Sequence, residues 1–87
     1  MSEERVAKIE AILTESFAPG YLLVKDQSHL HAGHAGARDG RGHFDVTIVS
    51  VAFSGKRALE CHRMVYAALG SLMDTDIHAL KINATSP

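Results

Sequence analysis

The first stripe of apolar positions in the chain has the spacing of an α-helix. Its members, three or four residues apart, are Val6, Ile9, Leu13 and Phe17, with Ile12 beside them. Such spacing places the side chains on one face of a helix. Ser2 is a suitable N-cap, and Pro19 followed by Gly20 is a stop signal. We therefore expect a helix that begins after Ser2 and ends before Pro19.

Three further segments have the composition or the alternation of β-strands. Residues 21–24 are apolar and partly β-branched, and residues from 44 to about 51 alternate between apolar and polar. Residues from 77 to about 84 alternate as well, with His78, Leu80 and Ile82 on one face. Between the first two strands, residues 27–42 have no periodicity, which predicts a long loop.

A second helix is expected from about residue 56 to residue 70, followed by a short turn at residues 72–74. At about 100° per residue, one side of this helix carries Ala58, His62, Val65, Tyr66, Leu69 and Met73. The opposite side carries Lys56, Glu60, Arg63 and Ala67. This projection predicts that His62 lies in the centre of the buried stripe and that Cys61 lies on the helix flank.

The predicted order of elements is helix, strand, strand, helix, short helix, strand, or αββααβ. This order defines an α+β fold, a two-layer sandwich of a three-stranded sheet with helices on one face. The first two strands can pair antiparallel, and the last strand, which arrives after helices, can join the sheet in parallel. We expect one domain over residues 1–87. No stretch approaches the roughly 18 apolar residues that a spanning helix needs, and we expect a cytoplasmic protein.

The charge balance argues against a strongly basic nucleic-acid-binding module. The chain has 9 Lys and Arg residues against 10 Asp and Glu residues, a formal net charge of −1. Lys56, Arg57 and Arg63 still gather on or beside the exposed side of the second helix, where they could contact phosphates. A solvated helix face is the alternative interpretation, and the presence of Glu60 among these cations favours it.

Histidine is the unusual residue of the composition, with six copies against a single cysteine. One cysteine excludes an internal disulfide and a self-contained iron–sulfur site with four cysteine ligands. His29, His31 and His34 lie together in the predicted loop and could converge on a metal. A closed site usually takes four ligands, so three loop histidines indicate a site that another group completes. The alternatives are a free-standing zinc site of these three residues and a solvated, histidine-rich loop.

The other three histidines are separated by their places in the pattern. His78, at the margin of the core, is interpreted equally well as a metal ligand and as a capping side chain hydrogen-bonded to a loop. For His62 in the second helix and His43 just before the second strand we favour structural roles, hydrogen-bonded and loop-anchoring respectively. No arrangement of a nucleophile with a base is recognisable, and we expect no enzymatic activity.

Six segments, in the order found here, resemble the BolA family. They are Asp26–Ser28, His31–Gly36, His43–Ser50, Phe53–Lys56, His62–Tyr66 and Ile77–Ile82. The resemblance extends from about Ser2 to Pro87 and implies a fold similar to the class II K-homology fold, with the same αββααβ order. One departure is Cys61, where the family commonly has Arg, which removes a positive charge from the second helix.

BolA-like proteins act with monothiol glutaredoxins in iron–sulfur cluster trafficking and iron regulation, so the resemblance implies an adaptor of this kind. It implies a 2Fe–2S cluster shared with the glutaredoxin and glutathione, each of which contributes a thiolate, and no cluster in the isolated chain. His78 matches the C-terminal ligand of the family, and His31 matches the loop ligand, with His34 as the alternative. Because this chain has a His rather than a Cys at the loop position, it resembles the histidine-type branch of the family.

A second function is also implied by the resemblance. Family members have been proposed as DNA-binding transcription regulators in stress and morphology responses. In this chain the second helix, with Lys56, Arg57 and Arg63, would carry that role. We expect no membrane partner, and a monomer or weak homodimer when the glutaredoxin is absent.

Overall fold

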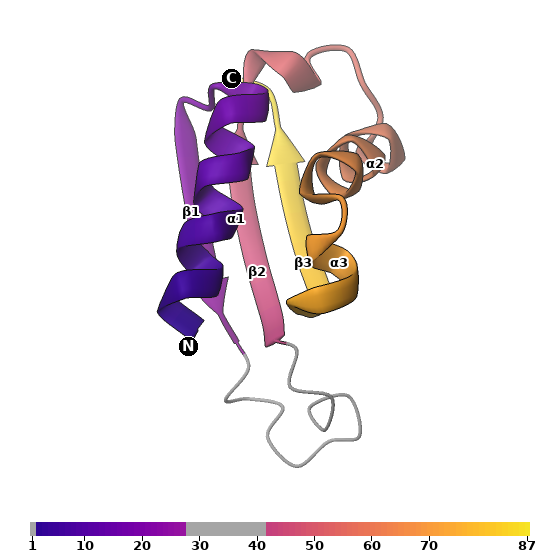
Figure 1. Ribbon diagram of the computed structural model, residues 1–87. Coiled ribbons are helices and arrows are strands. Elements are labelled where there is room, and N and C mark those ends of the chain that lie inside the picture. Colours follow the sequence, from indigo (N-terminus) through magenta and orange to yellow (C-terminus); the bar gives the residue numbers. More distant parts are fainter. Residues whose placement is uncertain (1, 28–41) are drawn as a thin grey trace.

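The computed structural model describes residues 2–27 and 42–87, and Figure 1 shows how its elements are arranged. In chain order they are α1 (Ser2–Phe17), β1 (Tyr21–Asp26), β2 (Gly42–Val49), the 3-10 turn η3 (Val51–Phe53), α2 (Ala58–Leu69), α3 (Leu72–Thr75) and β3 (Ile77–Thr85). The predicted order αββααβ is confirmed, with η3 as an addition. The predicted loop over residues 28–41, and with it His29, His31 and His34, lies outside the described residues.

The strands form one sheet with β2 in the centre. As the order of elements predicted, β1 pairs with β2 antiparallel and β3 pairs with β2 parallel. Helices α1, α2 and α3 lie on one face of this sheet (Figure 1), and Phe44, Val46 and Ile48 of β2 are buried in the core. The structure therefore confirms the two-layer α+β fold. Within the described ranges, no helix is long and apolar enough to span a membrane.

Helix α1 packs against the sheet through the stripe that its spacing predicted. Ile9 and Leu13 are fully buried and Phe17 is nearly so, and the partly buried residues beside them are Val6 and Ile12. The helix ends at Phe17, just before the predicted stop at Pro19. Ser2 is its first residue rather than its N-cap, a difference of one position that is common at helix ends.

Ser50 closes the end of the sheet at which α1 stops. Its hydroxyl donates to the carbonyl of Phe17 at 2.7 Å, and the same oxygen accepts the N–H of Ala52 at 3.1 Å. The Ser50 N–H donates to the carbonyl of Thr85 at 3.0 Å. These bonds satisfy the polar groups of a residue that is almost fully buried. They also turn the chain after β2, so Val51 belongs to η3 and the predicted strand end near residue 51 is wrong.

The buried face of α2 differs from the predicted one. The buried residues are Cys61, Val65 and Leu69, and Ala58 is exposed. Tyr66 is also exposed and His62 is half-buried, so the face is rotated by about 60° from the projected one. A free cysteine behaves as a small apolar side chain, and partly buried Met64 and Ala68 extend the stripe on its side. The prediction that Cys61 lies on the flank is therefore wrong.

The alternation predicted for β3 is interrupted at His78. Gly42 of β2 pairs with Ile77, whereas His43 pairs with Ala79, so one residue of β3 is inserted into the ladder as a β-bulge. As a result Ile77 is fully buried, and Leu80 is still partly buried against the core. His78 is exposed. The expectation that His78 shares the face of the next apolar residues is therefore wrong.

The rotation of α2 can be tested with two leucines of the same helix. Leu69 is 2% exposed and Leu59 is 60% exposed. We expect L69A to lower the free energy of unfolding by about 2–5 kcal/mol, because it leaves a cavity in the core. L59A should change it by less than about 0.5 kcal/mol. Urea unfolding followed by circular dichroism measures both, and equal losses would contradict this placement of the helix.

Candidate functional site

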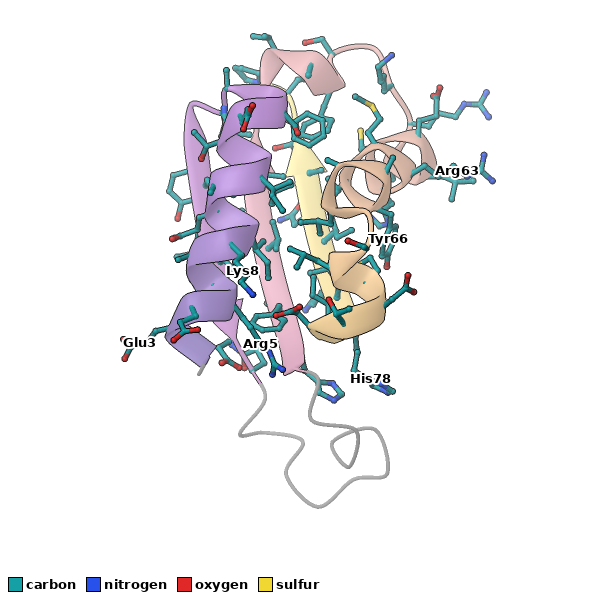
Figure 2. The ribbon with its side chains drawn as sticks, viewed as in Figure 1. Glu3, Arg5, Lys8, Arg63, Tyr66 and His78 are labelled. Carbon is teal, nitrogen blue, oxygen red and sulfur yellow. The ribbon has the colours of Figure 1, made fainter. Side chains whose placement is uncertain are left out.

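Of the three histidines among the described residues, His78 is the exposed one, and it lies at the end of the sheet opposite Ser50. It is the inserted residue of β3, and Figure 2 shows its side chain projecting from the lower end of the structure. The ring is exposed because the neighbouring Ile77 takes the buried position. An exposed neutral imidazole can offer a nitrogen lone pair to a metal. The geometry therefore suits the predicted ligand role.

The structure brings His43 next to His78. The centroids of the two rings are 5.2 Å apart, and the ring planes are inclined at 47°. His43 comes from β2 and is half-buried, and its Nε2 atom is buried. No pattern in the sequence pairs these two residues, which are 35 positions apart in the numbering. Only the register of the parallel strand pair puts them together.

The described residues on either side of positions 28–41 are both hydrogen-bonded at this end of the sheet. The N–H of Gln27 donates to the carbonyl of His43 at 2.7 Å, and the N–H of Gly42 donates to the carbonyl of Asp76 at 2.9 Å. Gln27 and Gly42, the described residues on either side of positions 28–41, therefore both lie beside the strand ends that carry His43 and His78. The candidate ligands His31 and His34, together with His29, belong to this segment, and the structure does not describe where they lie.

Asp76, two residues before His78, ties this end of β3 to α1. Its Oδ2 atom lies 3.4 Å from Arg5 Nε and 3.4 Å from Lys8 Nζ, and its Oδ1 accepts the Thr75 hydroxyl at 2.6 Å. Both cations come from the lower part of α1 as it is drawn in Figure 2. The Thr75 hydrogen bond first, and then the Lys8 and Arg5 cations, hold the pKa of the Asp76 carboxyl below its usual value. Asp76 thus links the start of β3 to the neighbouring Thr75 and to α1.

The described residues supply only part of a metal site. In residues 2–27 and 42–87, no three His, Cys, Asp or Glu side chains are grouped so that they could hold a metal ion. Cys61 cannot complete the set, because it is 2% exposed and packs in the core. A metal bound at His78 would therefore take ligands from outside this set, as the sequence analysis predicted for the loop histidines.

Two basic residues just before α2 and one on it form a separate candidate surface. Lys56, Arg57 and Arg63 are all exposed, as predicted, and Figure 2 shows Arg63 pointing away from the protein. The N–H of Arg57 donates to Glu60 Oε1 at 3.0 Å, so this acidic side chain caps the start of the helix. Leu59 and Tyr66 are exposed on the same helix. The surface around α2 thus combines basic side chains with exposed apolar ones.

A three-stranded α+β sandwich with these motifs defines a BolA-like protein. The family model described as BolA-like protein matches residues 13–87, and the chain belongs to this family. The resemblance seen in the sequence is confirmed. One relative, the chloroplastic protein BOLA1 of Arabidopsis thaliana, is 39% identical over 88 residues, which cover 98% of this chain and 55% of that protein.

Other relatives have different names. SufE-like protein 1 of Arabidopsis thaliana, chloroplastic/mitochondrial, is 40% identical over 95% of this chain and 24% of its own length. The DNA-binding transcriptional regulator BolA of Escherichia coli is 40% identical over 87% of this chain and 70% of its own length. This chain therefore spans about half of the first of the three and about a quarter of the second.

Solved structures agree with the fold. BolA1 from Arabidopsis thaliana superposes with a TM-score of 0.81 at 34% identity, and the BolA domain of SufE1 from the same organism with 0.85 at 38%. Each match covers 95% of this chain and 92% of the solved chain. The α+β architecture is therefore that of BolA structures.

The contribution of Asp76 can be tested through pH. Because folding lowers the pKa of Asp76, its carboxylate stabilises the fold above the unfolded pKa of about 3.9, and this contribution is lost as the pH falls through the folded value. We expect D76N to be less stable than the wild type at pH 7 by about 1 kcal/mol or less, as for exposed ion pairs. The difference should shrink below about pH 4.

Urea unfolding of both proteins over a series of pH values measures this difference. E10Q, which removes one negative charge from an exposed position of α1, serves as the matched control. A stability gap between D76N and the wild type that stays constant from neutral to acidic pH would contradict the role of the Asp76 charge.

Proposed function

We propose that this chain is an adaptor that binds a monothiol glutaredoxin and shares a 2Fe–2S cluster with it, in iron–sulfur cluster trafficking and iron regulation. The observation that carries the proposal is the exposed imidazole of His78. It stands at a bulge of β3, beside the two strand ends that flank the histidine-rich segment. The family membership supports the same function.

The ligands proposed for this chain are two histidines. His78 is one, and His31 is the other, with His34 as the alternative. The glutaredoxin and glutathione each contribute a thiolate. This division is supported by the burial of Cys61, which leaves the described residues without an accessible thiol.

Histidine ligands suit a protein that accepts and releases its cargo. An imidazole nitrogen binds a metal only in its deprotonated form, so binding through histidine ligands is in general sensitive to pH. Histidine in place of cysteine also raises the reduction potential of a 2Fe–2S cluster. The chain itself presents and orients the imidazoles, and we propose that it catalyses no reaction.

The role of His78 is tested by mixing the wild type or the H78A variant with cluster-loaded glutaredoxin and glutathione. Visible circular dichroism and the amount of bound iron are then measured. We expect H78A to lose the spectrum of the mixed complex and to shorten the lifetime of the cluster, because one of its ligands is removed. H62A is the matched control, since His62 is half-buried on α2 and has no part in the proposed ligand set. Thermal unfolding checks that both variants fold.

The same assay assigns the loop ligand. H31A should resemble H78A, and H34A should resemble the wild type unless His34 is the ligand. If H78A keeps the wild-type spectrum and cluster lifetime, His78 is not a ligand and the proposed ligand set is wrong.

A second candidate function is DNA binding through α2. It is favoured by the exposure of Lys56, Arg57 and Arg63, and by the relative from Escherichia coli that is named a DNA-binding transcriptional regulator. The formal net charge of −1 and exposed Leu59 on the same helix make it the weaker of the two. The glutaredoxin and DNA would then compete for neighbouring surfaces.

Salt dependence tests this second function. Each Lys or Arg that neutralises a phosphate releases a counterion, so K56A and R63A should each weaken duplex binding and reduce the salt slope by about 1. K81A is the control, because Lys81 is an exposed lysine on β3 rather than on α2. Fluorescence anisotropy at low and moderate salt measures binding, and no binding at low salt would remove DNA as a ligand.

A further inference from the structure

Strand β1 forms one edge of the sheet, and we propose that this edge binds a second copy of the chain, with the two β1 strands paired antiparallel. Within the described ranges β1 has a neighbouring strand on one side only, and Figure 1 shows it at the margin of the sheet. Tyr21 is 52% exposed and Leu23 is 38% exposed. A strand edge that carries exposed apolar side chains is a template for pairing with another chain.

The backbone of β1 directs hydrogen-bonding groups toward this edge. The N–H of Gln27 donates to the carbonyl of His43, and these two residues continue the register of β1 with β2. Hydrogen-bonded pairs alternate with non-hydrogen-bonded pairs along an antiparallel ladder. The residues at odd-numbered positions of β1 therefore bond to β2, whereas Leu22 and Val24 direct their N–H and C=O groups outward. The edge thus offers two donors and two acceptors, two residues apart.

The side chains of β1 fit a second β1 strand when the pairing is centred on Leu23. Leu22 and Val24 pack toward the core, so Tyr21, Leu23 and Lys25 lie on the face away from the helices. Directly opposite residues of two strands share a face, so a slip of one position would bring the two kinds of side chain together. In the centred register Leu23 meets Leu23 of the second copy, and Leu22 meets Val24. Their outward backbone groups then exchange hydrogen bonds.

The charge on the edge is complementary in the same register. A lysine on an edge strand ordinarily opposes pairing, but Lys25 stands opposite Asp45 of β2, which balances its charge within one copy. Across the interface Lys25 meets Tyr21 of the second copy, and an ammonium group is attracted to a tyrosine ring. A shift of the register in one direction sets Lys25 opposite Leu23 and then opposite itself. A shift in the other direction removes Lys25 from the pairing, so the centred register is favoured.

The pairing of β1 with β1 closes after two copies. A pairing of β1 with the opposite edge, β3, would leave a free edge on every copy and would continue into a filament. The paired segment, residues 21–25, is short compared with a standard protein–protein interface. We therefore expect a weak dimer, with a Kd on the order of 0.1 mM.

The first arm of the test is a charge exchange at the twofold axis. The isolated chain suffices, because the pairing uses neither a cluster nor a glutaredoxin. L23K and L23E should each weaken the dimer by about tenfold or more, since each places like charges opposite one another. An equimolar mixture of the two should associate again. L59K is the matched control, because Leu59 is 60% exposed on α2. Sedimentation velocity at several concentrations measures association, and thermal unfolding checks the fold of each variant.

The second arm needs no variant. Amide hydrogen exchange of the wild type, followed by NMR, should show the N–H groups of Leu22 and Val24 gaining protection as the protein concentration rises. The N–H groups of Leu23 and Lys25 should be protected by β2 at every concentration.

Four outcomes would overturn the proposal. The first is a wild type that stays monomeric at millimolar concentration, and the second is a dimer that L59K dissociates and L23K does not. The third is a mixture of L23K and L23E that associates no better than either variant alone, because Leu23 would then not lie opposite itself. The fourth is growth beyond two copies, which would indicate pairing of β1 with β3.

Discussion

The parallel pairing of β3 with β2, with one extra residue in β3, is the constraint on which the rest of this end of the molecule depends. Ile77 and Leu80 are separated by an odd number of positions, so a regular strand would send them to opposite faces. The bulge lets Ile77 be fully buried and Leu80 pack against the same core. His78 is exposed as a consequence of that packing. The exposure of the candidate ligand is therefore set by its apolar neighbours.

The two ends of the sheet are closed by different kinds of polar contact. At one end, Ser50 is buried and its hydroxyl and N–H join α1 and β3 through hydrogen bonds. At the other, the Asp76 carboxylate joins β3 to α1 through ion pairs with Arg5 and Lys8 near the surface. Buried hydrogen bonds are costly to break, whereas surface ion pairs contribute little and weaken with salt. The polar contacts at the end that carries His78 therefore contribute less to stability than those of Ser50.

Much of the fold was predictable because long periodic segments are hard to misread. The stripe of α1 was predicted and is confirmed, and the parallel pairing of β3, which the order of elements allowed, is observed. The phase of α2 was wrong because Tyr66 counted as apolar and Cys61 did not, although tertiary packing buries the cysteine and leaves the tyrosine exposed. The place of His78 at a strand end left a ligand role and a capping role equally open, and the resemblance to the BolA family favoured the ligand. Its contact with His43 could not be predicted, because the register of a parallel pair and a bulge leave no local signal in the sequence.

An incomplete ligand set is what a shared cluster requires of each partner. A chain with four accessible ligands of its own would hold a cluster without help, and transfer would then compete with that affinity. Here the described residues offer an exposed His78, the neighbouring ring of His43, and a Cys61 thiol enclosed in the core. Burial of that thiol removes the strongest competing donor from the surface. Under the proposed function, the composition of six histidines and one inaccessible cysteine makes binding dependent on thiolates supplied by the partner.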